Sequence, residues 1–144
     1  SSVGVSVVQT AAALTAALAL HIADEALTNF LGLWNPFAAG VREIVPWSPL
    51  PVFTFAEWLT GLVLLVALLA LLSIFALEGA RQLRPAAYAF AVVMIFNASG
   101  HIAASFYLGR FAPGVVSSPL LLAAGLWLLL ALLRSRLQDK RLSA

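Results

Sequence analysis

The sequence predicts an all-α fold, a polytopic integral membrane four-helix bundle with a proline-rich outer loop. Of its 144 residues, 62% are hydrophobic and 10% are charged, whereas soluble domains are about 45–50% apolar and 25% charged. Four stretches contain no Asp, Glu, Lys or Arg, namely 1–23, 58–77, 85–109 and 111–133. A membrane-spanning helix needs about 20 such residues. We therefore expect one transmembrane domain over residues 1–144.

The first two predicted spans cover approximately 5–30 and 54–77, and a short interfacial helix lies between them. Asn35-Pro36 is typical of a helix N-cap followed by its first turn, so it predicts that helix over Phe37–Val45. The prolines that follow keep the chain extended, because proline fixes φ and restricts the residue before it; they are Pro46, Pro49 and Pro51. This stretch is the predicted outer loop.

The last two predicted spans cover approximately 85–107 and 119–133. A short basic turn, Glu78–Arg84, precedes the third span, and Ala112-Pro113-Gly114 ends it. Ser118 with Pro119 predicts the start of the fourth span. The tail Arg134–Ala144 is polar.

The distribution of basic residues predicts the orientation in the membrane. Only two basic residues adjoin the ends of the spans on the side of the proline-rich loop, Arg42 and Arg110. By the positive-inside rule, both termini are expected in the cytoplasm. Six basic residues adjoin the opposite ends: Arg81, Arg84, Arg134, Arg136, Lys140 and Arg141.

Composition also excludes several classes of function. A net charge of +2 is too small to indicate a nucleic-acid partner, and the basic residues flank helices. The chain contains no cysteine, which excludes disulfides, thiolate metal sites and cysteine nucleophiles. The expected partners are the lipid bilayer and a small lipophilic ligand or substrate.

A polar cluster follows the first apolar run. His21, Asp24 and Glu25 are spaced at i, i+3 and i+4, so their side chains share one helix face. Ionisable groups at membrane depth are costly and indicate a functional site.

Helix rise places further polar residues near the same depth. With about 1.5 Å per residue, His21 and Glu25 lie about 24 and 30 Å from the cytoplasmic end of their helix, and Asn97 and His101 about 16 and 22 Å from theirs. Glu57 lies about one turn inside the outer face. Three helices therefore converge on one outward-facing His/carboxylate pocket.

Two chemistries remain open for this pocket. In the first, His21, Glu25, Glu57 and His101 bind one divalent transition metal, zinc, iron or manganese, with Asp24 as a further ligand or as the partner of a ligand. In the second, no metal is involved, and the same histidines and carboxylates exchange protons. Both chemistries describe an enzyme of isomerase or hydrolase type that acts on a small lipophilic substrate.

The metal-free interpretation gives a role to every polar member of the pocket. Glu25 or Glu57 transfers a proton with His21 or His101 as its partner. Asn97 binds a substrate oxygen or a developing oxyanion. The predicted catalytic residues are thus His21, Glu25, Glu57, Asn97 and His101.

A non-catalytic accessory or binding protein is the alternative. Histidines and carboxylates on facing membrane helices can hold a ligand, a metal or simply the helices themselves. The fourth span has no ionisable residue before Arg134, so its surface is available to a partner membrane subunit or a second copy.

The polar motifs resemble those of the HXXEE family of small bacterial membrane proteins. His21-Ile-Ala-Asp-Glu25 is similar to the family's signature, with Asp24 in place of the first glutamate. Asn97-Ala-Ser-Gly-His101, followed by Tyr107, Pro113 and Gly114, is similar to its second block. The resemblance implies a protein of the bacterial inner membrane with a metal or catalytic site. The family is uncharacterised, so the resemblance names no substrate.

Overall fold

The computed structural model describes residues 2–76 and 81–144, and its regular elements are all helical. No strand occurs among those residues, which confirms the predicted all-α class. The elements are α1 (Ser2–Leu27), α2 (Phe30–Ile44), α3 (Phe55–Ala76), the short 3-10 helix η1 (Arg81–Leu83), α4 (Arg84–Leu108) and α5 (Ser118–Leu142).

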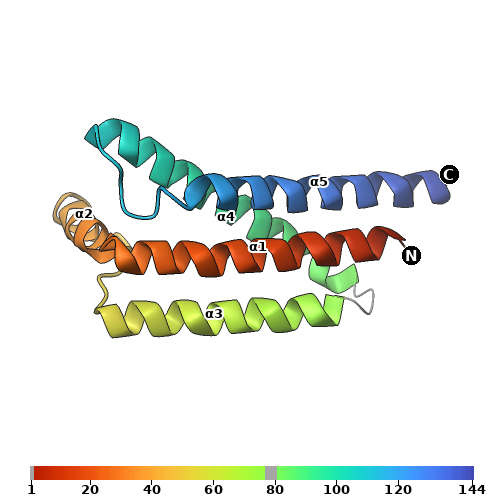
Figure 1. Ribbon diagram of the computed structural model, residues 1–144, viewed down its shortest axis with the longest axis horizontal. Helices are drawn as coiled ribbons and strands as arrows, with labels where there is room; N and C mark the ends of the chain where they lie inside the picture. Colours follow the sequence, from red (N-terminus) through yellow and green to blue (C-terminus); the bar gives the residue numbers. More distant parts are fainter. Residues whose placement is uncertain (1, 77–80) are drawn as a thin grey trace.

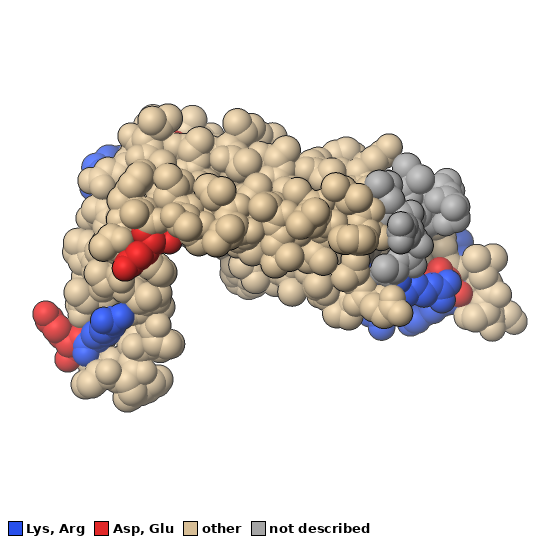
Figure 2. Space-filling view, turned by 90° about the horizontal axis from the view of Figure 1, so that it is seen from below, with Lys and Arg blue, Asp and Glu red and all other residues tan. Residues whose placement is uncertain are grey.

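Within residues 2–76 and 81–144, four segments are long and apolar enough to cross a membrane. They correspond to α1, α3, α4 with η1, and α5. α1 lies between α3 and α5, and α4 packs against α5 (Figure 1). Both termini lie at one end of this arrangement, and the α1–α2 junction and the α4–α5 loop lie at the other (Figure 1). The face seen in Figure 2 has its charged residues near the two ends, with a long uncharged surface between them.

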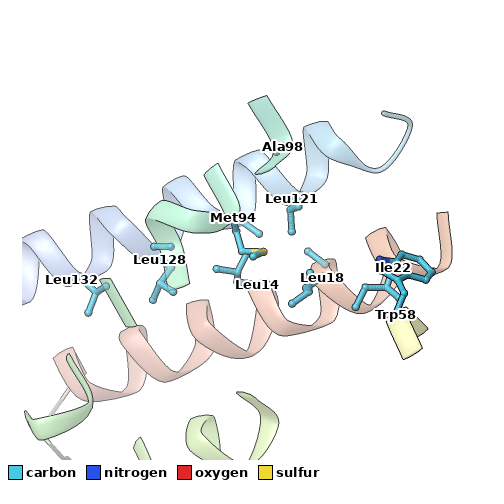
Figure 3. Close-up of a cluster of buried hydrophobic side chains, with 12 residues drawn as sticks. Leu14, Leu18, Ile22, Trp58, Met94, Ala98, Leu121, Leu128 and Leu132 are labelled. Carbon is cyan, nitrogen blue, oxygen red and sulfur yellow. The ribbon is translucent and has the colours of Figure 1, made fainter. Parts of the chain in front are cut away.

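The core consists of apolar stripes on three helices and one tryptophan from a fourth. Side chains spaced three or four residues apart share a helix face, and those of α1, α4 and α5 meet in the interior (Figure 3). Gly125 allows a close approach, because a Cβ there would lie 3.0 Å from Ile95 Cγ1. The largest members are Leu14, Leu18, Ile22, Trp58, Met94, Leu121, Leu128 and Leu132.

The junction between α1 and α2 differs from the sequence prediction. The first span was expected to continue to about residue 30, but α1 ends at Leu27 and Asn29 adopts a left-handed conformation with φ of 58°. Asparagine tolerates this conformation better than most residues. Its side-chain oxygen accepts a hydrogen bond from the Gly32 N–H, so Asn29 is the N-cap of α2.

Asn35 and Pro36, the predicted cap and first turn, instead lie inside α2. The Asn35 side chain binds the backbone of Phe53 in both directions, at 2.8 Å to its carbonyl and 3.0 Å from its N–H. Trp34 Nε1 donates to the Pro51 carbonyl at 2.9 Å. These contacts hold the segment 45–54, which has no helix, against α2.

The last helix is longer than the sequence analysis predicted. α5 continues to Leu142 instead of ending near residue 133, because its polar end consists largely of good helix formers. Asp139 in this extension accepts a hydrogen bond from Arg84 of α4 at 2.6 Å. In the predicted turn 78–84, residues 78–80 lie outside the described residues and 81–83 form η1.

Candidate metal centre

The buried stripes of α1 and α4 become polar at the same end of the core. On α1 the buried positions Leu14, Leu18 and Ile22 are accompanied by His21 and Glu25, which are 0% and 5% exposed. On α4 the buried stripe runs from Ala91 through Met94 and Ala98 to His101, which is 7% exposed. The same helical spacing that builds the apolar core therefore also places these three polar side chains inside the protein.

Three atoms from these side chains form a nearly equilateral triangle. His21 Nε2 lies 3.2 Å from His101 Nε2 and 3.2 Å from Glu25 Oε1. His101 Nε2 lies 2.9 Å from the same Glu25 oxygen. The structure thus confirms that helices α1 and α4 bring His21, Glu25 and His101 to one level.

The tautomer of the His101 ring follows from the hydrogen bond of Nδ1, the ring nitrogen that points away from the triangle. His101 Nδ1 lies 2.6 Å from the Pro113 carbonyl oxygen, which can only accept a hydrogen bond. Nδ1 therefore carries the hydrogen. In the neutral imidazole, Nε2 then presents a lone pair to the triangle.

The tautomer of the His21 ring follows from the contact of its Nδ1 with Ser117, which in turn contacts Asp24. Asp24 Oδ2 accepts hydrogen bonds from both the N–H and the hydroxyl of Ser117, at 2.9 and 2.7 Å. Because the hydroxyl gives its one hydrogen to this carboxylate, its oxygen accepts from His21 Nδ1 at 2.8 Å. His21 Nε2 also faces the triangle with a lone pair.

This network leaves two imidazole lone pairs and one carboxylate oxygen pointing at a common space. Three acceptors about 3 Å apart repel one another unless a cation or a proton lies among them. Orientation of the far histidine nitrogen by a carbonyl or a carboxylate is typical of metal-bound histidines. The described residues contain one group of at least three His, Cys, Asp or Glu side chains with metal-ligand proximity, and it is this one.

The α4–α5 loop packs directly on the cluster. Gly114 has φ of 83°, and a Cβ there would lie 2.8 Å from His101 Cε1 and 2.9 Å from Glu25 Cγ. Glycine is required at this position for two reasons: its backbone conformation and the close approach of the neighbouring side chains. The Gly114 N–H donates to Thr28 Oγ1 at 3.1 Å, and its carbonyl accepts from the Ser118 hydroxyl at 2.7 Å.

Glu57, the fourth metal ligand predicted from sequence, is not brought into the group. It is exposed at the start of α3, where Oε2 accepts a hydrogen bond from the Thr54 N–H at 3.0 Å. The Glu57 N–H in turn donates to Thr54 Oγ1 at 3.2 Å. This reciprocal pair is a capping box, which satisfies backbone donors at a helix start.

Asn97 and Asp24 have different relations to the triangle. Asn97 is half-buried on α4, one turn before His101, and we find no hydrogen bond of its amide among the residues that the structure describes. In the described part of the chain, the Asp24 carboxylate is linked to the triangle through the Ser117 hydroxyl. Sequence reasoning missed Ser117 and the Pro113 carbonyl. The Pro113-Gly114 break and the following pair of serines were the available signal.

A separate hollow adjoins the cluster on the α2–α3 side. We call it the aromatic hollow; its volume is about 330 Å³, and it is lined by Phe30, Trp34, Phe53, Glu57, Trp58, Gly61 and Leu62. Phe30 belongs to both regions, since its ring centroid also lies 5.5 Å from that of His101.

Comparison with known proteins identifies a family over most of the chain. The sequence profile of the family described as "Protein of unknown function with HXXEE motif" matches residues 12–128. The matched range includes His21, Glu25 and His101 together with the loop that carries Gly114 and Ser117. Searches of curated proteins and of solved structures returned no match.

Proposed function

We propose that this chain, which belongs to the family of proteins of unknown function with an HXXEE motif, is an integral membrane protein whose His21, Glu25 and His101 bind one divalent transition metal. The observation that carries the proposal is the triangle of two Nε2 atoms and one carboxylate oxygen, oriented by hydrogen bonds on its outer side.

The size of the triangle suits a metal ion. With sides of 3.2, 3.2 and 2.9 Å, a point equidistant from the three atoms lies about 1.8 Å from each. Metal–nitrogen and metal–carboxylate distances are about 2.0–2.2 Å, so the three atoms are close enough together for His21, Glu25 and His101 to bind the same ion. With three ligands from the protein, the ion would also bind water or substrate.

Two histidines and one carboxylate restrict the metal to a few elements. The set occurs in catalytic zinc sites and in the facial triad of non-haem iron, and it also suits manganese. Such a centre supplies Lewis-acid or water-activating chemistry. All three ligands are buried, so the site differs from an ion bound by charges on the surface. We propose that the protein is an enzyme and that its substrate is a small lipophilic molecule.

The location of the centre follows from the charge distribution. Basic residues gather at the end of the bundle that carries both termini, which by the positive-inside rule is the cytoplasmic end. The metal centre lies toward the other end, and we propose that it faces the outer side of a bacterial inner membrane.

A metal-free acid–base site is the second candidate. It is favoured by one observation, the 2.9 Å separation of His101 Nε2 and Glu25 Oε1, which is an ordinary hydrogen-bond length if one of the two atoms carries a proton. A proton shared within the triangle would relieve the same repulsion as a metal ion.

Metal content separates the two candidates. After purification without chelator, the metal proposal predicts about one equivalent of zinc, iron or manganese per chain, measured by plasma mass spectrometry. His21→Ala and His101→Ala are expected to remove it, whereas Asn97→Ala is expected to retain it. A folded wild-type protein that binds no metal, even after reconstitution with each of the three ions, would favour the acid–base site.

A further inference from the structure

We propose that the aromatic hollow binds a small uncharged lipophilic molecule and that this molecule reaches the metal centre past Phe30. This inference rests on the proposed function for the destination of the ligand, but not for its binding in the hollow. It gives the site a substrate class and a route of access.

The hollow has fixed walls. Trp34 is held by its hydrogen bond to the Pro51 carbonyl, and Phe53 is held by its two backbone hydrogen bonds with the Asn35 side chain. Trp58 is only 6% exposed. Ligand pockets are usually largely formed before the ligand binds, and these contacts explain how α2, the segment 45–54 and α3 keep this one open.

The chemistry of the lining favours an uncharged occupant. Five lining side chains are aromatic or aliphatic: Phe30, Trp34, Phe53, Trp58 and Leu62. Among the polar side-chain groups of the lining, Trp34 Nε1 already donates to the Pro51 carbonyl and Glu57 Oε2 already accepts from the Thr54 N–H. The volume of about 330 Å³ lies at the lower end of the range for small-molecule sites, about 300–1,000 Å³.

Access to the hollow is open from the side of α3. Little of α3 is buried: only 6% of its most apolar stretch lies inside the protein. Gly61, which lines the hollow, is exposed, and a Cβ at this position would have no neighbour within 4 Å. In a membrane this surface faces acyl chains, so a lipophilic molecule enters laterally without crossing water.

Phe30 is the shared wall between the hollow and the cluster. Its ring centroid lies 6.1 Å from that of Trp34, 6.0 Å from that of Trp58 and 5.5 Å from that of His101. It follows the left-handed Asn29 at the first position of α2. A change in the rotamer of this one side chain would open a path from the hollow to His101.

Photolabelling tests the binding step directly. The probe is a benzyl alcohol that carries a trifluoromethyl-diazirine, a small uncharged lipophile, applied to the full chain in bilayer nanodiscs and mapped by peptide mass spectrometry. We expect saturable labelling of residues 53–62 and 30–34. Labelling of the exposed surface of α5 around Trp127 and Leu130 should be non-saturable and serves as the internal reference.

Two glycine variants provide a matched pair. Gly61→Phe adds a ring at a residue that lines the hollow, and Gly61→Leu is a milder version of the same change. Gly100→Phe adds a ring at an α4 position that also has nothing within 4 Å of its Cβ but does not line the hollow. We expect the Gly61 variants to lose saturable labelling at least about tenfold, and the Gly100 variant to keep it.

The outcomes for the hollow and for the metal are separable. Binding in the hollow predicts that His101→Ala, which removes a metal ligand, still shows saturable labelling at residues 53–62. Labelling that is non-saturable at every site, or equal in Gly61→Leu and wild type, overturns the inference. Metal content measured in the same preparations would leave the proposed metal centre standing in that case.

Discussion

Glu25 and Glu57 were both predicted from the sequence to bind the metal, but the structure places them in different surroundings. Glu25 is buried between two histidines, and its oxygen is one corner of the triangle. Glu57 is exposed at the start of α3 and caps its own helix. The difference shows that depth along a helix selects candidates, but the partner on the neighbouring helix decides which carboxylate belongs to a site.

The largest effect is expected from Gly114→Ala. The added methyl group would meet His101 Cε1 and Glu25 Cγ at less than 3 Å, at a residue with φ of 83°. We expect metal binding to be abolished and stability to fall by about 2–4 kcal/mol, from overpacking and backbone strain together. Gly109→Ala is the control, because φ there is 63° with nothing within 4 Å. Equal metal content in both variants would contradict the proposed close packing of the loop on the site.

Asp24→Asn is expected to weaken metal binding without removing a ligand. Asp24 acts through Ser117, whose hydroxyl orients His21, and loss of such outer partners typically costs about 10–100-fold in metal affinity. Competition with a chromophoric chelator measures the change. Asp139→Asn, at the other end of the bundle, is the matched carboxylate control and should leave the affinity unchanged. A similar loss in both variants would indicate a general effect of charge.

Phe30→Ala is expected to expose the proposed metal centre to the hollow. Removal of the shared ring should let the membrane-permeant chelator 1,10-phenanthroline extract the metal several-fold faster, roughly three- to tenfold, at nearly unchanged affinity. Stopped-flow absorbance follows the extraction. Phe37→Ala, an exposed phenylalanine also on α2, should match wild type. Unchanged extraction from the Phe30 variant would mean that the metal is reached by another path.

The smallest effect on metal is expected from Glu57→Gln, which sharpens the comparison between the two carboxylates. Because the proposed ligands are His21, Glu25 and His101, this variant should keep its full metal content. It should lose about 0.5–1 kcal/mol of stability, because glutamine is a weaker partner in the capping box than a charged glutamate near a helix N-terminus. Thermal unfolding measures the loss. A metal-free Glu57→Gln protein would restore Glu57 as a ligand.

Much of the fold could be predicted because long uncharged apolar stretches have few alternatives. The spans, the break at Pro113-Gly114 and the helix following Ser118 all carry local signals. The N-cap at Asn29 was not predicted. From sequence alone, Asn35 followed by Pro36 looked like the better N-cap, and nothing indicated that Asn29 adopts the left-handed conformation. The added turns at the end of α5 were missed because a polar tail can be helical or not, and here Asp139 pairs with Arg84.

Some residues of the candidate site could also be predicted from the sequence, and others could not. His21 and Glu25 are one turn apart on α1, and helix rise places His101 at their depth, so their meeting was predictable. Ser117 and the Pro113 carbonyl belong to a loop whose path depends on tertiary contacts, such as that of Gly114 with Thr28. Glu57 illustrates an overlooked local signal, since Thr54-x-x-Glu57 has the spacing of a capping box.

X-ray absorption spectroscopy of the metal-loaded protein tests the central claim most directly. The account predicts a first shell at about 2.0–2.2 Å that contains two imidazole nitrogens and a carboxylate oxygen, completed by light atoms from solvent. Multiple-scattering features of two imidazoles should be present in the wild-type spectrum and should be unchanged in Glu57→Gln. A wild-type spectrum without imidazole scattering would contradict a metal centre built from His21, Glu25 and His101.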